Sequence, residues 1–297
     1  MPLSYYVLIR NNSGLIDLLF PNAPCPAGAC NITAVGTPIV LSALRSVDGR
    51  NASAQVAQSA VARASANVDL RLPSGRAISG RVTRAGAALA GVTVYIYNAT
   101  GSVYASGVTD ALGDWATSGS LPAGAGNSYY AATTSPSQRG ASGGVINKAW
   151  NNVPCMLDCG VTSVGTAIAL PAGVAPLANI NFDLELGGSI SGTVRASLGP
   201  VLSLVSVQLF DSSGRNVGSG TSDSLGNYQI DGLVPGSYFA RTSNLLGLQD
   251  LLFGGAICGA NCNPLNGNAI TVSGVALTPA IDFNLPQTDP LFKNGFE

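Results

Sequence analysis

The chain has 297 residues, of which 46% are hydrophobic and 10% are charged, and its net charge is −1. Such a chain is long enough to bury sizeable cores, and without a basic patch it is not expected to bind nucleic acid. No apolar run in the sequence reaches the roughly 18 residues that a membrane span needs. The 37 glycines and the scarcity of charge favour short strands joined by tight turns, so we expect an all-β protein.

The first residues of the chain match the end of a phrase that recurs later. Residues 2–6 (PLSYY) align with residues 235–239 (PGSYF). Residues 1–75 are therefore predicted to be the C-terminal remnant of a first repeat, which leaves an unpaired sheet edge. Either the protein extends upstream, with its export signal there, or this remnant packs on a neighbouring module. The Ala/Ser/Gln-rich stretch 51–65 is expected to form a short helix or a loose loop.

Two longer copies of the repeat follow. The segment Ala77–Val82 (AISGRV) returns as Ser189–Val194 (SISGTV). Each copy continues with an alternating strand, VTVYIY or VSVQLF, and closes with another, INFDL or IDFNL. Apolar residues at every second position place one face of such a strand in a core. We predict two β modules, at residues 76–186 and 187–288.

Each module also carries a predicted turn. The phrase TDALGDW contains Asp110 and Gly113, and the phrase SDSLGNY contains Asp223 and Gly226. Aspartate holds a turn by accepting a hydrogen bond from the backbone two residues on, and glycine takes the positive φ that the turn needs. Calcium takes at least about six oxygen ligands. A turn uses only one carboxylate, so we interpret these four residues as turn formers.

These phrases together resemble a known family. The order of an I-x-G-x-V strand, a V-x-V strand, D-x-x-G-x-aromatic and, in the second copy, L-x-x-G-x-Y is similar to that of the carboxypeptidase regulatory-like domain, a transthyretin-like (prealbumin-like) β-sandwich. The resemblance covers residues 74–132 and 187–241. It implies tandem seven-strand Greek-key sandwiches, with a truncated N-terminal module, of a kind common in secreted and surface bacterial proteins. The first copy departs from the pattern by the insertion AGAGNSYY and by Trp115 in place of tyrosine.

Histidine is absent from the sequence, which removes several catalytic and metal-binding chemistries. Without an imidazole there is no Ser-His-Asp or Cys-His pair and no histidine ligand for zinc. The stretch Gly140–Gly144 spells G-x-S-x-G around Ser142. That motif has meaning only on a strand-to-helix elbow with a histidine partner, so we interpret it as a glycine-rich loop. We predict that the protein is not an enzyme and holds no cofactor.

The cysteines form three close pairs, one in each repeat block: Cys25/Cys30, Cys155/Cys159 and Cys258/Cys262. Short-range pairs in a low-charge chain of secreted appearance are typical of disulfides. Structural zinc takes four ligands, whereas each pair offers two thiolates in a separate block, so disulfides are favoured over a metal or redox role. Closing so small a loop contributes only about 2 kcal/mol in the chain-entropy model. The disulfides are therefore expected to shape loops more than to hold the modules together.

An aromatic residue stands five positions before the first cysteine of each pair, namely Phe20, Trp150 and Phe253. A ring on a loop pinned by a disulfide is a candidate platform for a sugar ring. The alternative is that the ring packs on the disulfide and closes the end of the module. Phenylalanine serves in two of the three copies, which favours packing, but both interpretations stay open.

The combined prediction is a non-catalytic extracellular or cell-surface array of structural or adhesive modules within a larger protein. The alternative is a carbohydrate- or cell-wall-binding module that uses exposed aromatic residues. The partner is expected to be an unidentified protein or polysaccharide at the cell surface. Residues 289–297 form a C-terminal tail, either a recognition tail for export or surface attachment or a frayed end. No export signal stands in this chain, and we expect it upstream.

Overall fold

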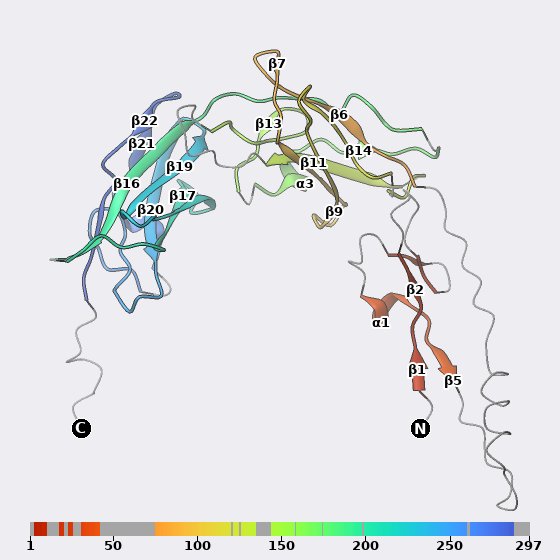
Figure 1. Ribbon diagram of the computed structural model, residues 1–297, viewed down its shortest axis with the longest axis horizontal. Helices are drawn as coiled ribbons and strands as arrows, with labels where there is room; N and C mark the ends of the chain where they lie inside the picture. Colours follow the sequence, from red (N-terminus) through yellow and green to blue (C-terminus); the bar gives the residue numbers. More distant parts are fainter. Residues whose placement is uncertain are drawn as a thin grey trace, which may run out of the picture.

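The computed structural model describes residues 3–10, 18–20, 23–25, 31–41, 75–119, 121–124, 126–134, 144–157, 159–173, 175–197, 199–259 and 262–287 (Figure 1). This part of the chain is built almost wholly of strands, which confirms the predicted all-β class. Its helical segments are short: α1 (Ile32–Val35), α3 (Val161–Val164) and the 3-10 turn η2 (Pro264–Asn266). In these ranges no helix has the length and apolar character to cross a membrane. The stretch 51–65, Ser142, Cys30 and the tail 289–297 lie outside the described residues.

The first sandwich, which we define as residues 75–186, has two sheets. Its strands are β6 (Ser79–Arg84), β7 (Ala87–Ala88), β8 (Thr93–Tyr97), β9 (Val103–Val108), β10 (Asp114–Ala116), β11 (Ser128–Thr134), β12 (Lys148–Ala149), β13 (Val153–Pro154), β14 (Ile168–Ala169) and β15 (Phe182–Asp183). One sheet has the order β10–β6–β15, with β7 beside β6. The other has the order β13–β12–β11–β8–β9, with β14 beside β11. The closing strand β15 runs parallel to β6, whereas β10 runs antiparallel to it.

The second sandwich, residues 187–287, repeats this arrangement. Its strands are β16 (Gly188–Ala196), β17 (Ser206–Asp211), β18 (Asn216–Thr221), β19 (Asn227–Leu233), β20 (Gly236–Ser243), β21 (Ile270–Val272), β22 (Leu277–Thr278) and β23 (Phe283–Leu285). One sheet has the order β19–β16–β22, with β23 beside β16, and the other has the order β18–β17–β20–β21. Here too the closing strand, β23, runs parallel to the first strand, β16. The two copies therefore share one topology.

Each sandwich has a hydrophobic core of its own, built where the sequence alternates. In β8 the side chains of Val94 and Ile96 are buried between partly buried neighbours. The closing strands add the largest fully buried side chains, Phe182 in the first core and Phe283 in the second. Burial of a phenylalanine side chain stabilises a fold by about 1.5–3 kcal/mol. The parallel closing strand is thus part of each core, not an appendage to it.

The N-terminal segments pair in the same way as the later part of each sandwich. Strand β1 (Leu3–Tyr5) pairs with β5 (Ile39–Leu41), as β11 pairs with β14 and β20 with β21. Strands β2 (Leu8–Ile9), β3 (Leu18–Leu19) and β4 (Ala23–Pro24) form a small antiparallel sheet, in which β3 and β4 pair as β12 and β13 do. The N-terminal strands therefore share these pairings with both sandwiches, and the assignment of residues 1–75 as a remnant stays a prediction.

Candidate functional site

Disulfides close the cysteine pairs of both sandwiches. Cys155 is bonded to Cys159 and Cys258 to Cys262, with Cα–Cα distances of 5.1 and 5.2 Å. These two predicted pairs are confirmed. Cys25 is also disulfide-bonded, and no described cysteine is free. Within the described ranges, no group of three or more His, Cys, Asp or Glu side chains is placed to hold a metal ion.

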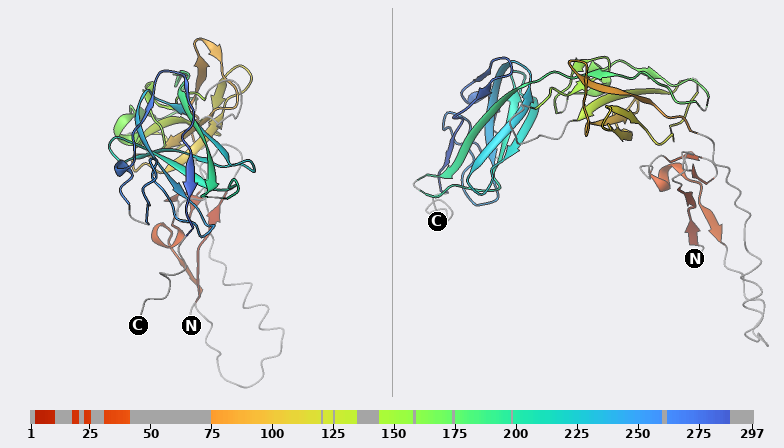
Figure 2. Two further views of the ribbon diagram at one scale, coloured as in Figure 1. Left: turned by 90° about the vertical axis from the view of Figure 1, so that its left-hand side faces the viewer. Right: turned by 45° about the horizontal axis from the view of Figure 1, so that its top comes forward.

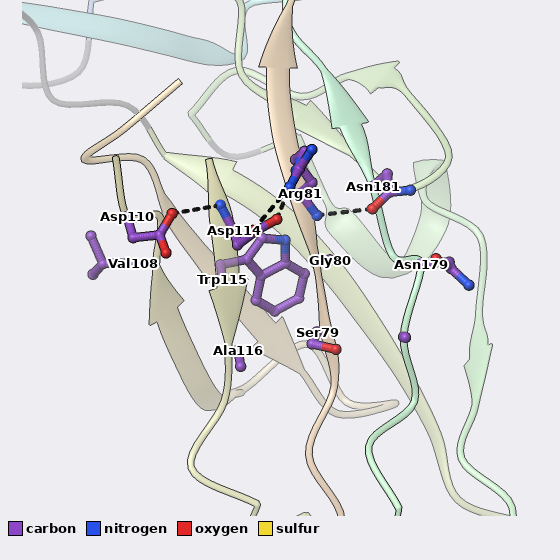
Figure 3. Close-up of a pocket in the computed structure, with 11 residues that line it drawn as sticks. Ser79, Gly80, Arg81, Val108, Asp110, Asp114, Trp115, Ala116, Asn179 and Asn181 are labelled. Carbon is purple, nitrogen blue, oxygen red and sulfur yellow. Dashed lines mark hydrogen bonds and ion pairs between the residues drawn. The ribbon is translucent and has the colours of Figure 1, made fainter. Parts of the chain in front are cut away.

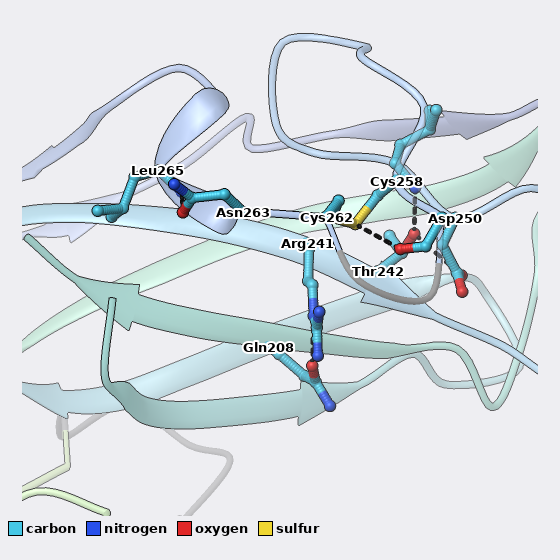
Figure 4. The surroundings of a disulfide bond; sticks show 10 residues. Gln208, Arg241, Thr242, Asp250, Cys258, Cys262, Asn263 and Leu265 are labelled. Atoms are coloured by element: carbon cyan, nitrogen blue, oxygen red, sulfur yellow. Dashed lines mark hydrogen bonds between the residues drawn. A yellow bond between two sulfur atoms is a disulfide. The ribbon is translucent and has the colours of Figure 1, made fainter. Parts of the chain in front are cut away.

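The two disulfide loops are anchored by equivalent backbone bonds. Cys155 donates its N–H to the carbonyl oxygen of Asn147, and Cys258 donates to that of Asp250, both at 2.7 Å. In the second sandwich the carboxylate of Asp250 also accepts a hydrogen bond from the hydroxyl of Thr242 at 3.3 Å (Figure 4). Each loop therefore starts from a fixed backbone point and does not depend on its disulfide alone.

The three aromatic candidates occupy one backbone position in their respective blocks. The carbonyl oxygens of Phe20, Trp150 and Phe253 accept the N–H groups of Thr37, Thr166 and Asn268, respectively. Trp150 is partly buried against the first core. Phe253 is partly buried against the second core, with its ring edge-to-face on Phe283 at 6.1 Å. The described contacts of these two rings are packing contacts, and a ligand-binding role for the three residues stays a prediction.

Asp110 and Asp223 sit in matching turns. The Oδ1 atom of Asp110 accepts the N–H of Leu112 at 2.8 Å and that of Asp114 at 2.9 Å. The Oδ1 atom of Asp223 accepts two N–H groups in the same register, both at 2.9 Å. Gly113 and Gly226, at the end of these turns, have φ values of +76° and +75°, where an L side chain is strained.

The two sandwiches meet at a junction (Figure 2), where residues 185–187, which lead into the second sandwich, pair with residues 144–146 of the first. Ile146 donates its N–H to the carbonyl oxygen of Glu185 at 2.8 Å, and Gly187 donates to that of Gly144 at 2.9 Å. An antiparallel bridge lies between these two bonds. The connection is therefore two-stranded at this point, because a segment of the first sandwich runs beside the linker that enters the second.

Glycines allow the backbones of the two sandwiches to touch. A Cβ atom on Gly232 would lie 2.5 Å from the carbonyl oxygen of Val145, and one on Gly144 would lie 2.7 Å from the Cβ of Asp231. A Cβ on Gly187 would lie within 2.7 Å of the Gly232 backbone. Gly232 also has a φ of +73°, which side chains rarely tolerate. A side chain at Gly144 or Gly232 would push the sandwiches apart, whereas one at Gly187 would disturb the start of the second sandwich.

The disulfide loop of the first sandwich also reaches the second. Met156 packs against the second core, and the hydroxyl of Tyr238 lies 3.9 Å from its Sδ atom. A cavity of about 510 Å³ adjoins this contact and is lined by residues of both sandwiches. The other two loops have Pro26 and Gly259 directly after their first cysteine. At this position only the loop of the first sandwich has a long apolar side chain in the sequence, and that side chain contacts the second sandwich.

A groove of about 810 Å³ lies on the first sandwich (Figure 3), and none of the three aromatic residues predicted as ligand contacts lines it. Its lining comes from three stretches of chain, within residues 79–81, 108–116 and 178–181. The guanidinium of Arg81 donates to both carboxylate oxygens of Asp114, at 2.7 and 3.0 Å, and these two side chains are about half exposed. This hydrogen bonding holds the pKa of Asp114 below its usual value. Asn181 accepts the Arg81 backbone N–H through Oδ1 at 2.8 Å.

Trp115 lines this groove and is also part of the first core, with 3% of its surface exposed. Among the described residues, its indole Nε1 is the one buried side-chain polar atom without a hydrogen-bond partner. Leaving a buried donor unpaired costs about 1–3 kcal/mol. Tyr228 holds the equivalent position in the second sandwich and donates its hydroxyl to the carbonyl oxygen of Ile281 at 2.6 Å. In the sequence, the sign of this difference is that position 115 is tryptophan where the second copy has Tyr228.

No protein-family model and no curated protein matches the chain. Among solved structures, it is similar to the minor pilin of Streptococcus agalactiae, with 12% identity over 72% of this chain and 97% of that one and a TM-score of 0.29. It is also similar to the shaft pilin of Lactobacillus rhamnosus GG (13%, 72% and 98%, TM-score 0.28). The TIE protein of Bacillus anthracis (13%, TM-score 0.27) matches 72% of this chain, which spans only 34% of that protein. TM-scores this low do not identify a common fold, so fold and function rest on the residues of the chain itself.

Proposed function

We propose that this chain is a non-catalytic structural or adhesive protein of the extracellular space or cell surface, in which the two sandwiches act as one stiff spacer. The observation that carries the proposal is the junction. Paired backbone segments, closely packed glycines and Met156 fix one sandwich against the other. Modules on a flexible linker would instead be joined by a single exposed segment that makes few contacts.

A buried lysine beside the junction, paired with the exposed carboxylate of Glu185, supports the same conclusion. The Lys148 side chain is 7% exposed, and its Nζ donates to the carboxylate of Glu185 at 2.7 Å and to the carbonyl oxygen of Asp183 at 2.8 Å. Glu185 is the residue whose carbonyl oxygen accepts the N–H of Ile146 at the junction. A buried ammonium group that lost these partners would be strongly destabilising. Glu185, which leads toward the second sandwich, is thus bound to the first sandwich through its side chain as well as through its backbone carbonyl oxygen.

The carboxylates of the groove support a role without catalysis. Asp110 uses Oδ1 to hold its turn, and Asp114 is paired with Arg81 and has a lowered pKa. An acid catalyst at neutral pH needs a raised carboxyl pKa. No imidazole is present in the sequence to replace these groups.

The compartment and the finer assignments are part of the proposal. Disulfides form and persist in oxidising environments, which favours a location outside the cytoplasm. We carry forward the resemblance of residues 74–132 and 187–241 to carboxypeptidase regulatory-like modules. The proposed partner is an unidentified protein or polysaccharide at the cell surface.

Rotational diffusion tests the spacer role. We expect ¹⁵N relaxation of the full chain to give one common diffusion tensor for both sandwiches. In Gly232→Ala the added methyl meets the Val145 carbonyl oxygen at a backbone φ of +73°, so the sandwiches should separate and tumble with shorter, unequal correlation times. Gly259→Ala is the matched control, because a Cβ there meets nothing within 4 Å. Independent tumbling of the two sandwiches in the unaltered protein would refute the proposal.

A further inference from the structure

We propose that Met156 is an oxidation switch for the junction. A peroxide converts its thioether to a sulfoxide, and the sulfoxide releases the second sandwich from the first. The inference rests on the proposed spacer function, because the stiffness that the switch regulates is that of the junction. It adds a modification site and a chemical signal that a spacer alone does not require.

Met156 is the side chain that connects the two cores. Among the described hydrophobic residues that are partly buried against the second core, it is the one that belongs to the first sandwich. The residues that pack against the first core all belong to the first sandwich itself. The junction glycines, Gly144 and Gly232, bring backbone atoms together and have no side chain to bury. Met156 therefore supplies the apolar side-chain contact between the cores.

The sulfur atom of Met156 lies between packed side chains and an open space. Its Sδ atom is 3.9 Å from the hydroxyl oxygen of Tyr238. The side chain is only partly buried, and it lines the cavity of about 510 Å³ that residues of both sandwiches enclose. This volume is many times the roughly 30 Å³ that one water molecule takes up in the liquid, so a small peroxide can reach the sulfur.

The covalent step needs only the peroxide as its co-reactant. The sulfur of Met156 attacks one oxygen of hydrogen peroxide, the O–O bond breaks, and the sulfur is oxidised by two electrons. One oxygen stays on the sulfur as the sulfoxide, and the other leaves as water. The product is a polar side chain in place of a flexible apolar one, a change that disrupts interfaces in which methionine packs.

The second core cannot pair the new oxygen atom at this contact. The polar group beside the sulfur, the hydroxyl of Tyr238, already donates its hydrogen to the carbonyl oxygen of Val234. A sulfoxide oxygen directed at the core would therefore lie unpaired among apolar side chains, which is unfavourable. The oxidised side chain is expected to turn into the cavity, where water solvates it, and to leave the second core.

The sequence allows a peroxide response of the junction to be assigned to one residue. Its two methionines are Met1 and Met156. The corresponding positions of the other two cysteine loops are Pro26 and Gly259, neither of which forms a sulfoxide. No described cysteine is free, so thiol oxidation does not compete in that part of the chain.

Treatment of the full chain with hydrogen peroxide tests the proposal. Peptide mass mapping follows the gain of oxygen at Met156, ¹⁵N relaxation follows the tumbling of the sandwiches, and calorimetry follows their unfolding. Oxidation should lower the melting temperature of the second sandwich by roughly 5–10 °C. It should also give the two sandwiches shorter, unequal correlation times. Methionine sulfoxide reductases for both epimers should reverse these changes.

Two variants separate the switch from general oxidative damage. Met156→Leu keeps an apolar side chain of similar volume without a sulfur, so its sandwiches should stay coupled before and after peroxide. Combining Met156→Leu with Leu157→Met moves the thioether to a neighbouring position, which is 54% exposed in the unaltered chain. Oxidation there should leave the sandwiches coupled.

The proposal is overturned if peroxide does not oxidise Met156 in the folded chain, or if the sulfoxide forms and the tumbling stays unchanged. An equal response of Met156→Leu to peroxide would also overturn it. These failures leave the spacer function standing, since the untreated chain would still tumble as one body. Independent tumbling before peroxide is added would refute the spacer function and this inference with it.

Discussion

Replacing Met156 by alanine should uncouple the two sandwiches without unfolding the first. The methionine side chain is partly buried and packs against the second core, while its backbone belongs to a loop of the first sandwich. Truncating a fully buried methionine costs about 2–5 kcal/mol. For a partly buried one we expect about 1–2 kcal/mol, taken from the stability of the second sandwich. In a domain of this size that lowers the melting temperature by roughly 5–10 °C.

Differential scanning calorimetry of the full chain measures this effect, and the neighbouring residue supplies the control. Leu157 stands in the same loop but is 54% exposed, so Leu157→Ala should change stability by less than about 0.5 kcal/mol. A cysteine-free loop, made by Cys155→Ser and Cys159→Ser together, adds a second check. Met156→Ala should cost less in that background, because the loop no longer holds the side chain against the second core.

The reasoning fails if Met156→Ala and Leu157→Ala lower the melting temperature equally. It fails in another way if Met156→Ala destabilises the first sandwich alone, since the methionine would then serve its own loop and not the junction. Loss of about 1–2 kcal/mol from the second sandwich only, in the presence of the disulfide, is the result that the structure requires.

Two further predictions concern the sandwiches themselves. Burial raises the pKa of Tyr129 to about 12, so the stability that its neutral form provides is complete below about pH 10 and is lost as the pH rises toward 12. In Tyr129→Phe, the loss of stability between pH 9 and pH 11.5, measured by urea unfolding, should be smaller by about 2 kcal/mol, and an unchanged loss would contradict this. Asp223→Ala removes the acceptor of the Leu225 and Asn227 N–H groups and should cost about 1–2 kcal/mol in thermal unfolding, whereas Ser224→Ala, in the same turn, should be close to neutral. Equal effects of these two turn variants would show that the carboxylate does not hold the turn.

Much of the fold could be predicted because its causes are local in the sequence. Alternation in VTVYIY and INFDL marks strands with one buried face, and those strands carry Ile96 and Phe182 into the first core. The close cysteine pairs were predictable for the same reason, since two thiols four residues apart meet within one loop. The junction was not predictable. It depends on pairing between residues near 145 and 186, and on glycines that are needed only because two distant backbones touch there.

The candidate sites were harder to predict than the fold. Trp150 was predicted as a ligand contact from its spacing to the cysteines. Spacing shows which residues are neighbours in the sequence, but it does not show whether a ring is exposed to solvent. In the structure that residue is partly buried against the first core. The groove lies beside the other tryptophan, Trp115. The repeat shows that this tryptophan replaces a tyrosine, but it does not show that the indole nitrogen lacks a hydrogen-bond partner. Whether a buried N–H finds an acceptor depends on the third strand of the sheet, which joins from residues far along the chain.

Comparison of the two copies within the chain separates positions that the shared fold explains from positions that it does not. Positions that match, such as Gly80 and Gly192 or Asp110 and Asp223, are explained by strand contact and turn geometry, which both sandwiches need. Positions at which the two copies have different residues need a cause that applies to one copy alone. Met156 in place of Gly259 has such a cause at the junction. Trp115 in place of Tyr228 exchanges a hydroxyl bonded to the Ile281 carbonyl oxygen for an indole nitrogen without a partner among the described residues, and no described contact explains that exchange.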